Sequence, residues 1–533
     1  GVEYVYSTSA PGQSMVVVRF KVGEPEEAAL VRLNQKLQAN FDRIPPGVIG
    51  PIVKPRSIDD VPILALTLWS PHYGDDQLRR LAAQLRDAIT EVPDVSEVTL
   101  LGGRPRQVRV EIDPARLSAY GLGAMDVQRA LGGNNAVRST VGTTSAGANT
   151  IVDTGSLLRS VTDVEQTVVT TREGRRVLVS DVATVTDGDA EPTTYVSFVS
   201  RDSGSHPAVT IAVSKRKGTN ATSVAERVLA KVDTMRGTVV PSDVTVSVTR
   251  DYGETAAEKG NELLWHMLIA VISVSALIWI ALGRREAAVV LIAIPVTLAL
   301  TLFMFYLYGY TLNRITLFAL IFSIGILVDD AIVVVENIVR HARENRDGSG
   351  FAAVAIRAVD EVGNPTILAT LAVVAAILPM AFVGGLMGPY MRPIPVGASA
   401  AMAFSLIVAF IVTPWAAIRL LKPSSHGDHS SEDAFTRLYR RIMRPLLDSA
   451  KVRWMFLSGV AVLLLAAIAL VPLGLVTVKM LPFDNKSEFQ VMVDMPEGTP
   501  LETTARVAGE LAVAALGDPA VTDVQSYVGT SAP

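Results

Sequence analysis

Two adjacent carboxylates lie in the middle of an apolar segment. In "GILVDDAIVVVEN", residues 325–337, Asp329 and Asp330 have aliphatic side chains on both sides. A charged side chain at the centre of a bilayer costs about 2.5 to 3.5 kcal/mol on insertion scales, and two neighbours cost about twice that. Repulsion between adjacent carboxylates also favours the binding of a proton. We therefore predict a reversible proton site whose occupancy is linked to conformation.

Helical geometry extends this pair into a polar seam. Adjacent residues of a helix are about 100° apart, so positions seven apart return to nearly the same face. Ser323, Asp330 and Asn337 therefore share one stripe, and Asp329 and Glu336 share the next. We expect this seam to face the interior of a helix bundle rather than lipid.

The residues alone leave two other roles for the aspartate pair open. One is a Na⁺ site, because carboxylate, serine and asparagine oxygens suit a hard cation. The other is an ion-pair anchor for a basic side chain on another helix, although one carboxylate would be enough to hold one cation. The sequence does not separate proton coupling from Na⁺ coupling.

Composition indicates that part of the chain lies in a membrane. The 533 residues are 49% hydrophobic and 19% charged, with a mean hydropathy of +0.36. A net charge of -4 and the lack of a dense basic run give no reason to expect nucleic-acid binding. The absence of cysteine excludes disulfides, thiolate metal sites and cysteine nucleophiles.

The apolar residues concentrate in six long segments after residue 262. Each reaches the roughly 20 residues that a helix needs to cross a hydrocarbon core of about 30 Å. Lys and Arg lie in every second link between them, which places those links in the cytoplasm and residues 1–262 and 480–533 outside it. Pro295, Pro379 and Pro414 are expected to kink the helices. The predicted spans are 263–282, 287–309, 315–339, 366–385, 396–418 and 454–478.

A basic amphipathic helix is predicted over residues 432–450, between the last two spans. Its apolar and basic side chains have helical spacing on opposite faces: Phe435, Leu438, Ile442 and Leu446 against Arg437, Arg440, Arg441 and Arg444. Such a helix lies in the plane of the inner leaflet. A solvated helix hairpin is the alternative.

Several enzyme classes lack their motifs in this chain. No G-x-x-x-x-G-K-[ST] phosphate loop occurs, so ATP hydrolysis is not expected, and neither H-E-x-x-H nor G-x-S-x-G is present. His426 and His429 lie in a short polar stretch without a second ligand cluster, so we interpret them as part of a solvated loop. We expect a transporter rather than an enzyme, with no cofactor and no metal site.

A repeat relates two segments of the predicted external domain. Residues 62–102 and 489–529 both have the order strand, helix, Pro-x-Val-x-x-Val strand, which predicts βαβ units of an α+β domain. The opening "GVEYVYS" matches only the last strand of that unit. We therefore expect the chain to be a fragment that begins partway through one copy and ends partway through another.

At this point the residues carry a resemblance to a known family. "GILVDDAIVVVENIVRH" (325–341) resembles the fourth-helix signature of the resistance-nodulation-division (RND) exporters, in their hydrophobe/amphiphile efflux branch of AcrB-like multidrug pumps. The resemblance covers the whole chain, because further segments are similar to the family's periplasmic segments in order: "VPILALTL", "PDVSEVTLLGG", "RVEIDPARLSAYGL", "VLVSDVATV" and "LPFDNKSEFQVMVDMPEGTP".

The resemblance implies a proton antiporter of the bacterial inner membrane that exports amphiphilic small molecules. The family has twelve helices and two large periplasmic loops, forms homotrimers, and works with a periplasmic adaptor (membrane fusion) protein and an outer-membrane channel. Asp329 and Asp330 match the family's proton-relay aspartates, and "VDDA" favours the amphiphile branch over the metal-exporting one. The basic partner of the relay belongs to a second helical half that is not in this chain, so the fragment alone is not expected to pump.

The fold class implied is an α-helical transmembrane bundle plus α+β periplasmic porter and docking subdomains built from βαβ repeats. The chain would divide into the first porter subdomain (1–57), the second (58–118 with 189–250), a funnel-like docking subdomain (119–188), the transmembrane domain (251–480) and the start of a third porter subdomain (481–533).

One departure from the family concerns the substrate. Multidrug members line a distal pocket with several phenylalanines, whereas residues 1–262 contain only Phe20, Phe41 and Phe198. Asp59 and Asp60 stand where the pocket-lining stretch begins, which favours a less aromatic or more cationic substrate, although a solvated turn before a strand explains them equally well. A secretion-assisting or lipid-handling relative, or a sensor of the same fold, is the alternative to efflux. The docking-like segment and the repeated porter units favour efflux over the secretion or lipid-handling role, and a sensor would not need adjacent aspartates.

Overall fold

The computed structural model describes the chain except residues 11, 146–147, 156, 173, 282, 345–349, 386, 422–433 and 477–487, so His426 and His429 lie outside the described residues. The chain divides into two compact units. We call them the helical unit, Gly1–Pro55 with Thr255–Phe489, and the sheet unit, Arg56–Glu254 with Gln490–Pro533.

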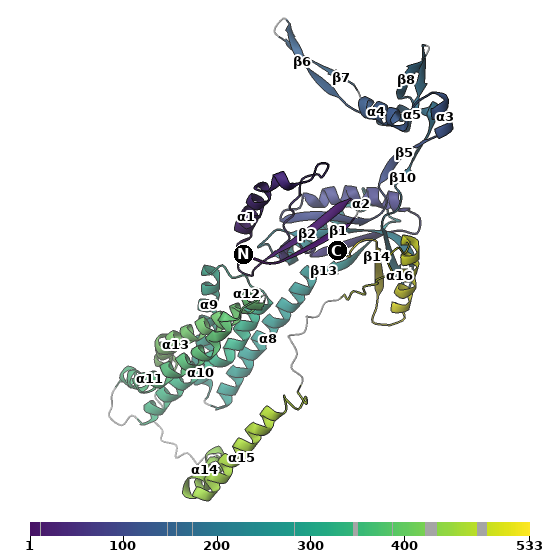
Figure 1. The fold of residues 1–533 in the computed structure, drawn as a ribbon. Helices are drawn as coiled ribbons and strands as arrows, with labels where there is room; N and C mark the ends of the chain where they lie inside the picture. The colour runs from purple at the N-terminus through teal and green to yellow at the C-terminus, as the bar shows by residue number, and fades with distance from the viewer. Residues whose placement is uncertain are drawn as a thin grey trace. The chain divides into compact units, whose positions relative to one another are not determined.

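Among the described residues, six helices are long and apolar enough to cross a membrane, which confirms the predicted number of spans. They are α8 (Tyr252–Ala281), α9 (Arg284–Leu307), α10 (Arg314–Glu344), α11 (Phe351–Ile377), α13 (Pro393–Leu420) and α15 (Ala450–Ala469). Figure 1 shows α9, α10, α11 and α13 running side by side as a bundle.

The helix ends differ from the predicted spans because helical structure and hydrophobicity do not end together. Helices α8 and α11 begin at 252 and 351, against predicted starts of 263 and 366, since polar turns precede their apolar parts. Helix α15 ends at Ala469 rather than at 478, the latter outside the described residues. Pro472 disfavours helix at the residue before it, and Gly474, with φ of +71°, completes a turn. Pro379 lies in a 3₁₀ segment, Leu378–Phe382, and therefore does not kink a helix.

Small side chains let the bundle helices approach closely. At Gly397 of α13, a Cβ atom would lie 2.7 Å from the Phe305 ring of α9. Ala398 and Ala401, on the same face of α13, are completely buried. Such residues are typical of membrane-helix interfaces, where close backbone approach replaces hydrophobic burial as the source of stability.

The helical unit also contains short elements outside the six spans. Strands β1 (Val2–Ala10) and β2 (Gln13–Phe20) form an antiparallel hairpin. The remaining elements are α1 (Glu26–Gln38), the 3₁₀ turn Phe41–Arg43, α12 (Met387–Met391) and α14 (Ala434–Asp448). Helix α14 agrees with the amphipathic helix predicted over 432–450.

The sheet unit has the split βαβ arrangement of ferredoxin-like domains. Its neighbouring strands follow the order β13-β3-β12-β11-β14. Strand β11 pairs with the first residues of β12, 204–207, and β4 pairs with residues 209–215 of the same strand. The strands and helices are β3 (Leu64–Trp69), α2 (Asp75–Thr90), β4 (Val95–Gly102), β11 (Tyr195–Ser200), β12 (Gly204–Lys215), α7 (Ala221–Met235), β13 (Thr245–Asp251), α16 (Leu501–Ala515) and β14 (Asp523–Val528), with a 3₁₀ turn at Ile58–Asp60. The order β3-α2-β4 confirms the strand-helix-strand pattern predicted for residues 62–102.

Alternation along β3 separates the two faces of this sheet. Leu64, Leu66 and Leu68 are fully buried in one core with residues of α2 and α7. Thr67 and Trp69 lie on the opposite face, where the Thr67 hydroxyl is 3.0 Å from that of Thr210. On the same face, the Trp69 ring stacks on Phe198 at 5.2 Å and on His206 at 5.3 Å.

The second repeat copy is only partly formed. Its helix α16 and strand β14 are present, and β14 pairs antiparallel with β11. The predicted first strand is wrong: residues 488–496 have no strand, and Phe489, Val491 and Met492 are exposed. A strand requires a hydrogen-bonded neighbour, and the described residues supply none for this segment.

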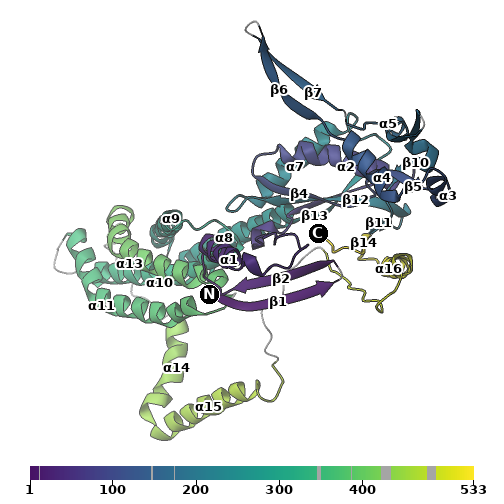
Figure 2. The same ribbon diagram turned by 45° about the horizontal axis from the view of Figure 1, so that its top comes forward.

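An insertion between β4 and β12 forms its own small core. Strands β5 and β10 carry the chain out and back as an antiparallel pair, and the β6–β7 hairpin extends from the far end of the insertion (Figure 2). Its elements are β5 (Arg106–Ile112), α3 (Pro114–Ala119), α4 (Ala124–Asn134), β6 (Arg138–Ser145), β7 (Ala148–Thr154), α5 (Val161–Glu165), β8 (Val168–Arg172), β9 (Arg175–Leu178), α6 (Val179–Val182) and β10 (Ala183–Asp189).

One arginine fastens the base of this insertion to the ferredoxin-like sheet. Arg104 pairs with Asp189, at 2.9 Å, where β10 returns, and with Asp75, at 3.4 Å, in the first turn of α2. Partial burial raises the pKa of the Asp75 carboxyl, against the opposing effect of the Arg104 charge. The ion pairs therefore hold both crossing strands to the same helix terminus.

Gly102, at the exit from β4, is predicted to tolerate no side chain. Its φ is +85°, and a Cβ atom there would lie 2.6 Å from the Val196 Cβ and 2.9 Å from the Ala208 oxygen. We expect Gly102→Ala to lower the free energy of unfolding of the full-length protein by about 1 to 3 kcal/mol. The loss is measured as a lower melting temperature, followed by tryptophan fluorescence.

Gly204→Ala is the matched control for this prediction. Gly204 has nearly the same φ, +81°, but nothing lies within 4 Å of its Cβ position. The control bears the backbone strain without the clash, so its shift is expected to be smaller. Equal shifts would show that the close packing at Gly102 contributes nothing.

Candidate functional site

The polar seam of α10 is divided between buried and exposed positions. Ser323 and Asn337 have relative exposures of 0% and 6%, and Asp330 between them is half-buried. Asp329 and Glu336, on the neighbouring stripe, are exposed. The two aspartates therefore differ in environment although they are adjacent in sequence.

Asp330 lies where α10, α11 and α13 meet. The Thr370 hydroxyl of α11 is 3.4 Å from Oδ1 of Asp330, and it donates over 2.9 Å to the Thr366 carbonyl in its own helix. The Ser405 hydroxyl of α13 donates over 2.7 Å to the Leu327 carbonyl and also interacts with the Asp330 carboxylate. Each hydroxyl has one proton, so the carboxylate competes with a backbone carbonyl for both donors.

The other end of the seam connects α10 to α11. The Asn337 amide donates over 2.7 Å to the Ala358 carbonyl. One turn further along α10, Arg340 donates over 2.7 Å to Glu361, and His341 pairs with the same carboxylate. Because Glu361 is about half exposed, its ion pairs contribute little to stability. The buried hydrogen bond from Asn337 to Ala358 is the stronger link between the two helices.

The carboxylate pair has hydroxyl neighbours rather than cationic ones in the part of the chain that the structure describes. Within that part, no Lys, Arg or His nitrogen lies within 4.0 Å of Asp329 or Asp330. The arrangement found is one half-buried carboxylate with two hydroxyl donors beside an exposed second carboxylate. This donor set can hold a proton, or with its oxygens a hard cation.

Sequence reasoning missed the two hydroxyl residues. Thr370 and Ser405 are 40 and 75 positions from Asp330 in the chain, so no helical spacing relates them to it. A weak signal exists in each span, because Thr370 in "LATLA" and Ser405 in "AFSLI" are among the few polar residues of apolar segments that also hold Thr366, Ser399 and Thr413. Polar residues in a membrane helix tend to face the bundle interior, but which of them meets Asp330 depends on packing between helices.

Asp59 and Asp60 have structural partners at the start of β3. Asp60 accepts a hydrogen bond of 2.6 Å from the Ser57 backbone and closes a capping box. Asp59 pairs with Lys215 of β12 at 3.1 Å. These contacts favour a structural turn over a cation-binding role for both carboxylates.

The fold and the seam define a multi-spanning membrane protein with a ferredoxin-like domain outside the bundle and a partly buried carboxylate between three of its helices. The family model described as "AcrB/AcrD/AcrF family" matches residues 1–532. The chain therefore belongs to the AcrB/AcrD/AcrF family of RND efflux proteins, which are multi-pass proteins of the bacterial inner membrane.

Curated relatives carry the name "Multidrug resistance protein MdtC". Those of Yersinia pestis bv. Antiqua (strain Angola) and Yersinia pseudotuberculosis serotype O:3 (strain YPIII) are each 28% identical to this chain over 473 residues. The match covers 88% of this chain and 45% of either relative, so the chain spans about half the length of these relatives.

Two buried serines test whether bonds between helices stabilise the seam. Ser405 donates to a carbonyl of another helix, whereas Ser323 donates to Leu320 in its own helix, and both are almost fully buried. In the full-length protein, we expect Ser405→Ala to lower thermal stability by about 0.5 to 2 kcal/mol. Ser323→Ala is the control and should shift the melting transition less. Equal shifts would contradict a specific role for the bond between α13 and α10.

Proposed function

We propose that the full-length protein exports amphiphilic small molecules and is driven by protons that bind at Asp329 and Asp330. The observation that carries this proposal is the position of Asp330, half-buried between three spanning helices and beside two hydroxyl donors. The family membership and the names of the relatives support export as the activity.

The proposed coupling follows from hydrogen-bond chemistry. An ionised Asp330 can only accept, so it favours hydroxyl protons of Thr370 and Ser405 that point toward it. A protonated Asp330 is neutral and gains a donor, so both hydroxyls can return fully to their backbone carbonyls. The two protonation states thus favour different contacts of α10 with α11 and α13, which is the differential interaction that a two-state transporter needs.

The supporting roles of the other seam residues belong to the same proposal. Asn337 and Ser323 keep the seam polar along α10, and Glu336 extends the stripe of Asp329 toward the Arg-rich end of the helix. Covalent continuity offers a route for the resulting movement, because β13 ends at Asp251 and α8 begins at Tyr252.

The assembly and domain assignments are also proposals. Efflux proteins of this family typically work as trimers with an adaptor and an outer-membrane channel. We extend this to the full-length protein as a homotrimer with a periplasmic adaptor and a channel. Residues 1–57, 58–118 with 189–250, and 481–533 would be porter segments, 119–188 the docking subdomain, and 251–480 the transmembrane domain. A lipid-handling or secretion-assisting relative is the alternative.

Asp330→Asn is the direct test of the relay. The amide is nearly isosteric but cannot take up a proton, so we expect proton-driven efflux of a fluorescent amphiphile from vesicles to fall at least about a hundredfold. Asp360→Asn is the control, because Asp360 is an exposed acid of α11 outside the seam, and its efflux should stay near wild type. Unchanged efflux in Asp330→Asn would overturn the assignment.

The driving ion is decided on the wild-type protein. In vesicles with an imposed pH gradient and no Na⁺, we expect efflux, and with a Na⁺ gradient at equal pH we expect none. The oxygen-rich surroundings of Asp330 make Na⁺ the competing ion. If efflux follows the Na⁺ gradient instead, Na⁺ rather than the proton is the coupling ion, and the proposed export function stands.

Thr370→Val tests the hydroxyl nearest to the relay carboxylate. Thr366 and Thr370 are both buried, both donate to a carbonyl four residues earlier, and only Thr370 reaches Asp330. We expect Thr370→Val to slow efflux about threefold to tenfold and to change its pH dependence, because one donor to the ionised carboxylate is lost. Thr366→Val should leave both unchanged, and equal effects would indicate a packing role.

A further inference from the structure

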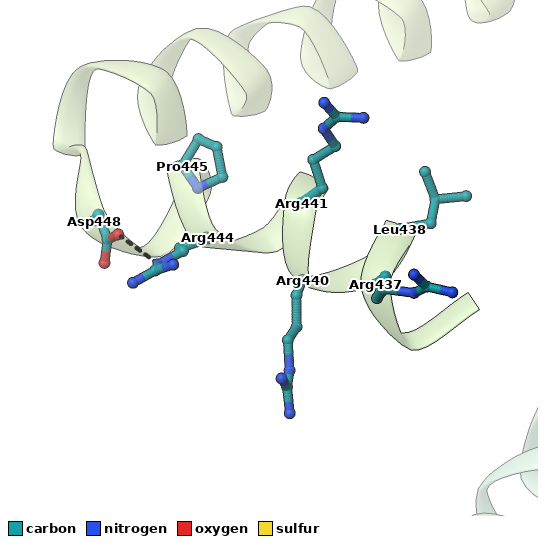
Figure 3. A pocket seen from close by; sticks show the side chains of 7 residues that line it. All are labelled: Arg437, Leu438, Arg440, Arg441, Arg444, Pro445 and Asp448. Carbon is teal, nitrogen blue, oxygen red and sulfur yellow. Dashed lines mark ion pairs between the residues drawn. The ribbon is translucent and has the colours of Figure 1, made fainter. Parts of the chain in front are cut away.

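Helix α14 (Ala434–Asp448) presents arginines on one face and apolar side chains on the other. Figure 3 shows the arginines projecting from successive turns of the helix. Every one of them is exposed, and the side chain of Arg444 is 85% exposed. They are Arg437, Arg440, Arg441 and Arg444; Ile442 and Leu446 lie away from them, and Leu438 lies at the border between the two sides.

In the described part of the chain, Arg437, Arg441 and Arg444 are at most weakly compensated by acidic residues. The Asp448 carboxylate is 3.9 Å from Arg444 Nε. Among the described residues, Arg437 and Arg441 have no carboxylate within 4.0 Å. The arginines border a surface hollow of about 810 Å³, which Leu438, Pro445 and Asp448 also line. The face therefore selects an anion.

The chain confines α14 to the membrane surface. It lies between the end of α13 at Leu420 and the start of α15 at Ala450, and both helices are spans. The Arg419 guanidinium lies 4.4 Å from the centre of the Trp415 ring in the last turn of α13, an arrangement typical of the headgroup region. Arg453 and Trp454 lie in the first two turns of α15. The positive-inside rule places this end in the cytoplasmic leaflet.

We propose that the arginine face of α14 binds phosphate groups of anionic phospholipids in the cytoplasmic leaflet. The planar guanidinium matches phosphate oxygens with two parallel donors, and a basic side chain at an anionic surface contributes about fivefold in affinity. Ile442 and Leu446 then lie toward the acyl chains, with Leu438 at the border, which keeps the helix in the interface plane. This lipid site is separate from ion coupling at Asp330 and does not depend on the proposed function.

The test uses the purified full-length protein after delipidation. Phosphatidylglycerol and phosphatidylcholine are titrated separately, and bound lipid is counted by native mass spectrometry. We expect phosphatidylglycerol to bind at least about tenfold more tightly, with a preference that weakens as salt increases. Equal affinities for the two lipids in the wild-type protein would overturn the proposal. So would full displacement of phosphatidylglycerol by millimolar inorganic phosphate, because the site would then take a soluble anion.

Matched variants test whether the preference for phosphatidylglycerol arises from α14. Replacing all four arginines by glutamine (Arg437→Gln, Arg440→Gln, Arg441→Gln and Arg444→Gln) should remove it. The control replaces four exposed arginines of the sheet unit: Arg86→Gln, Arg129→Gln, Arg236→Gln and Arg506→Gln. It has the same net charge as the test variant and should keep the preference. A preference that survives in the α14 variant, or is lost equally in the control, would overturn the assignment.

Single substitutions keep the test decisive if the quadruple variant does not assemble. Arg441→Gln and Arg444→Gln should each weaken phosphatidylglycerol binding about fivefold while phosphatidylcholine binding stays constant. Asp448→Asn removes the neighbouring negative charge and should strengthen phosphatidylglycerol binding. Phosphatidylglycerol affinity that is unchanged in all three variants would overturn the proposal.

Discussion

The cost of holding Asp330 between spanning helices is the constraint on which the helical unit depends. An ionised side chain at the centre of a membrane helix costs about 2.5 to 3.5 kcal/mol on insertion scales, and a hydrogen bond between membrane helices returns about 0.6 to 2 kcal/mol. Two hydroxyls, from Thr370 and Ser405, therefore offset the cost only approximately, and each also has a backbone carbonyl to bond. Such a near balance is what the proposed function requires, because a single proton could then change which contacts of α10 are favoured.

That balance requires α11 and α13 to approach α10 closely, and small residues make this approach possible. The carboxylate reaches Ser405 only because α13 packs against α10 along a face of small side chains, among which Ala398 and Ala401 are fully buried. Gly397 allows the same helix to contact the Phe305 ring of α9. The apolar packing and the polar seam are thus two parts of one arrangement: the first fixes the distances at which the second can form hydrogen bonds.

The sequence predicted the parts of this structure that depend on local pattern. Six spans, the strand-helix-strand unit after residue 62 and the stripe through Asp330 all follow from periodicity and length, and the spans and that unit are confirmed. The partners of Asp330 could not be predicted, because they depend on which helices pack together. The strand expected near residue 489 failed for a related reason: its alternating pattern is real, but a strand also needs a neighbour. The end of α15 was missed because hydrophobicity continues past Pro472 while helix geometry does not.

The same distinction between local pattern and packing separates two charged sites of the helical unit, Asp330 in the third span and the arginines of α14 between the last two spans. In the proposed function, Asp330 changes its charge within the bundle, so neighbouring helices must fix its position. On α14, the arginines are exposed and remain charged, so they need no packed partner and can be recognised from spacing alone. A group whose change of charge is to alter helix packing needs packed partners, whereas a group that binds an anion at a membrane surface must stay accessible. Half-buried Asp330 and exposed Arg444 fit the two roles proposed for them.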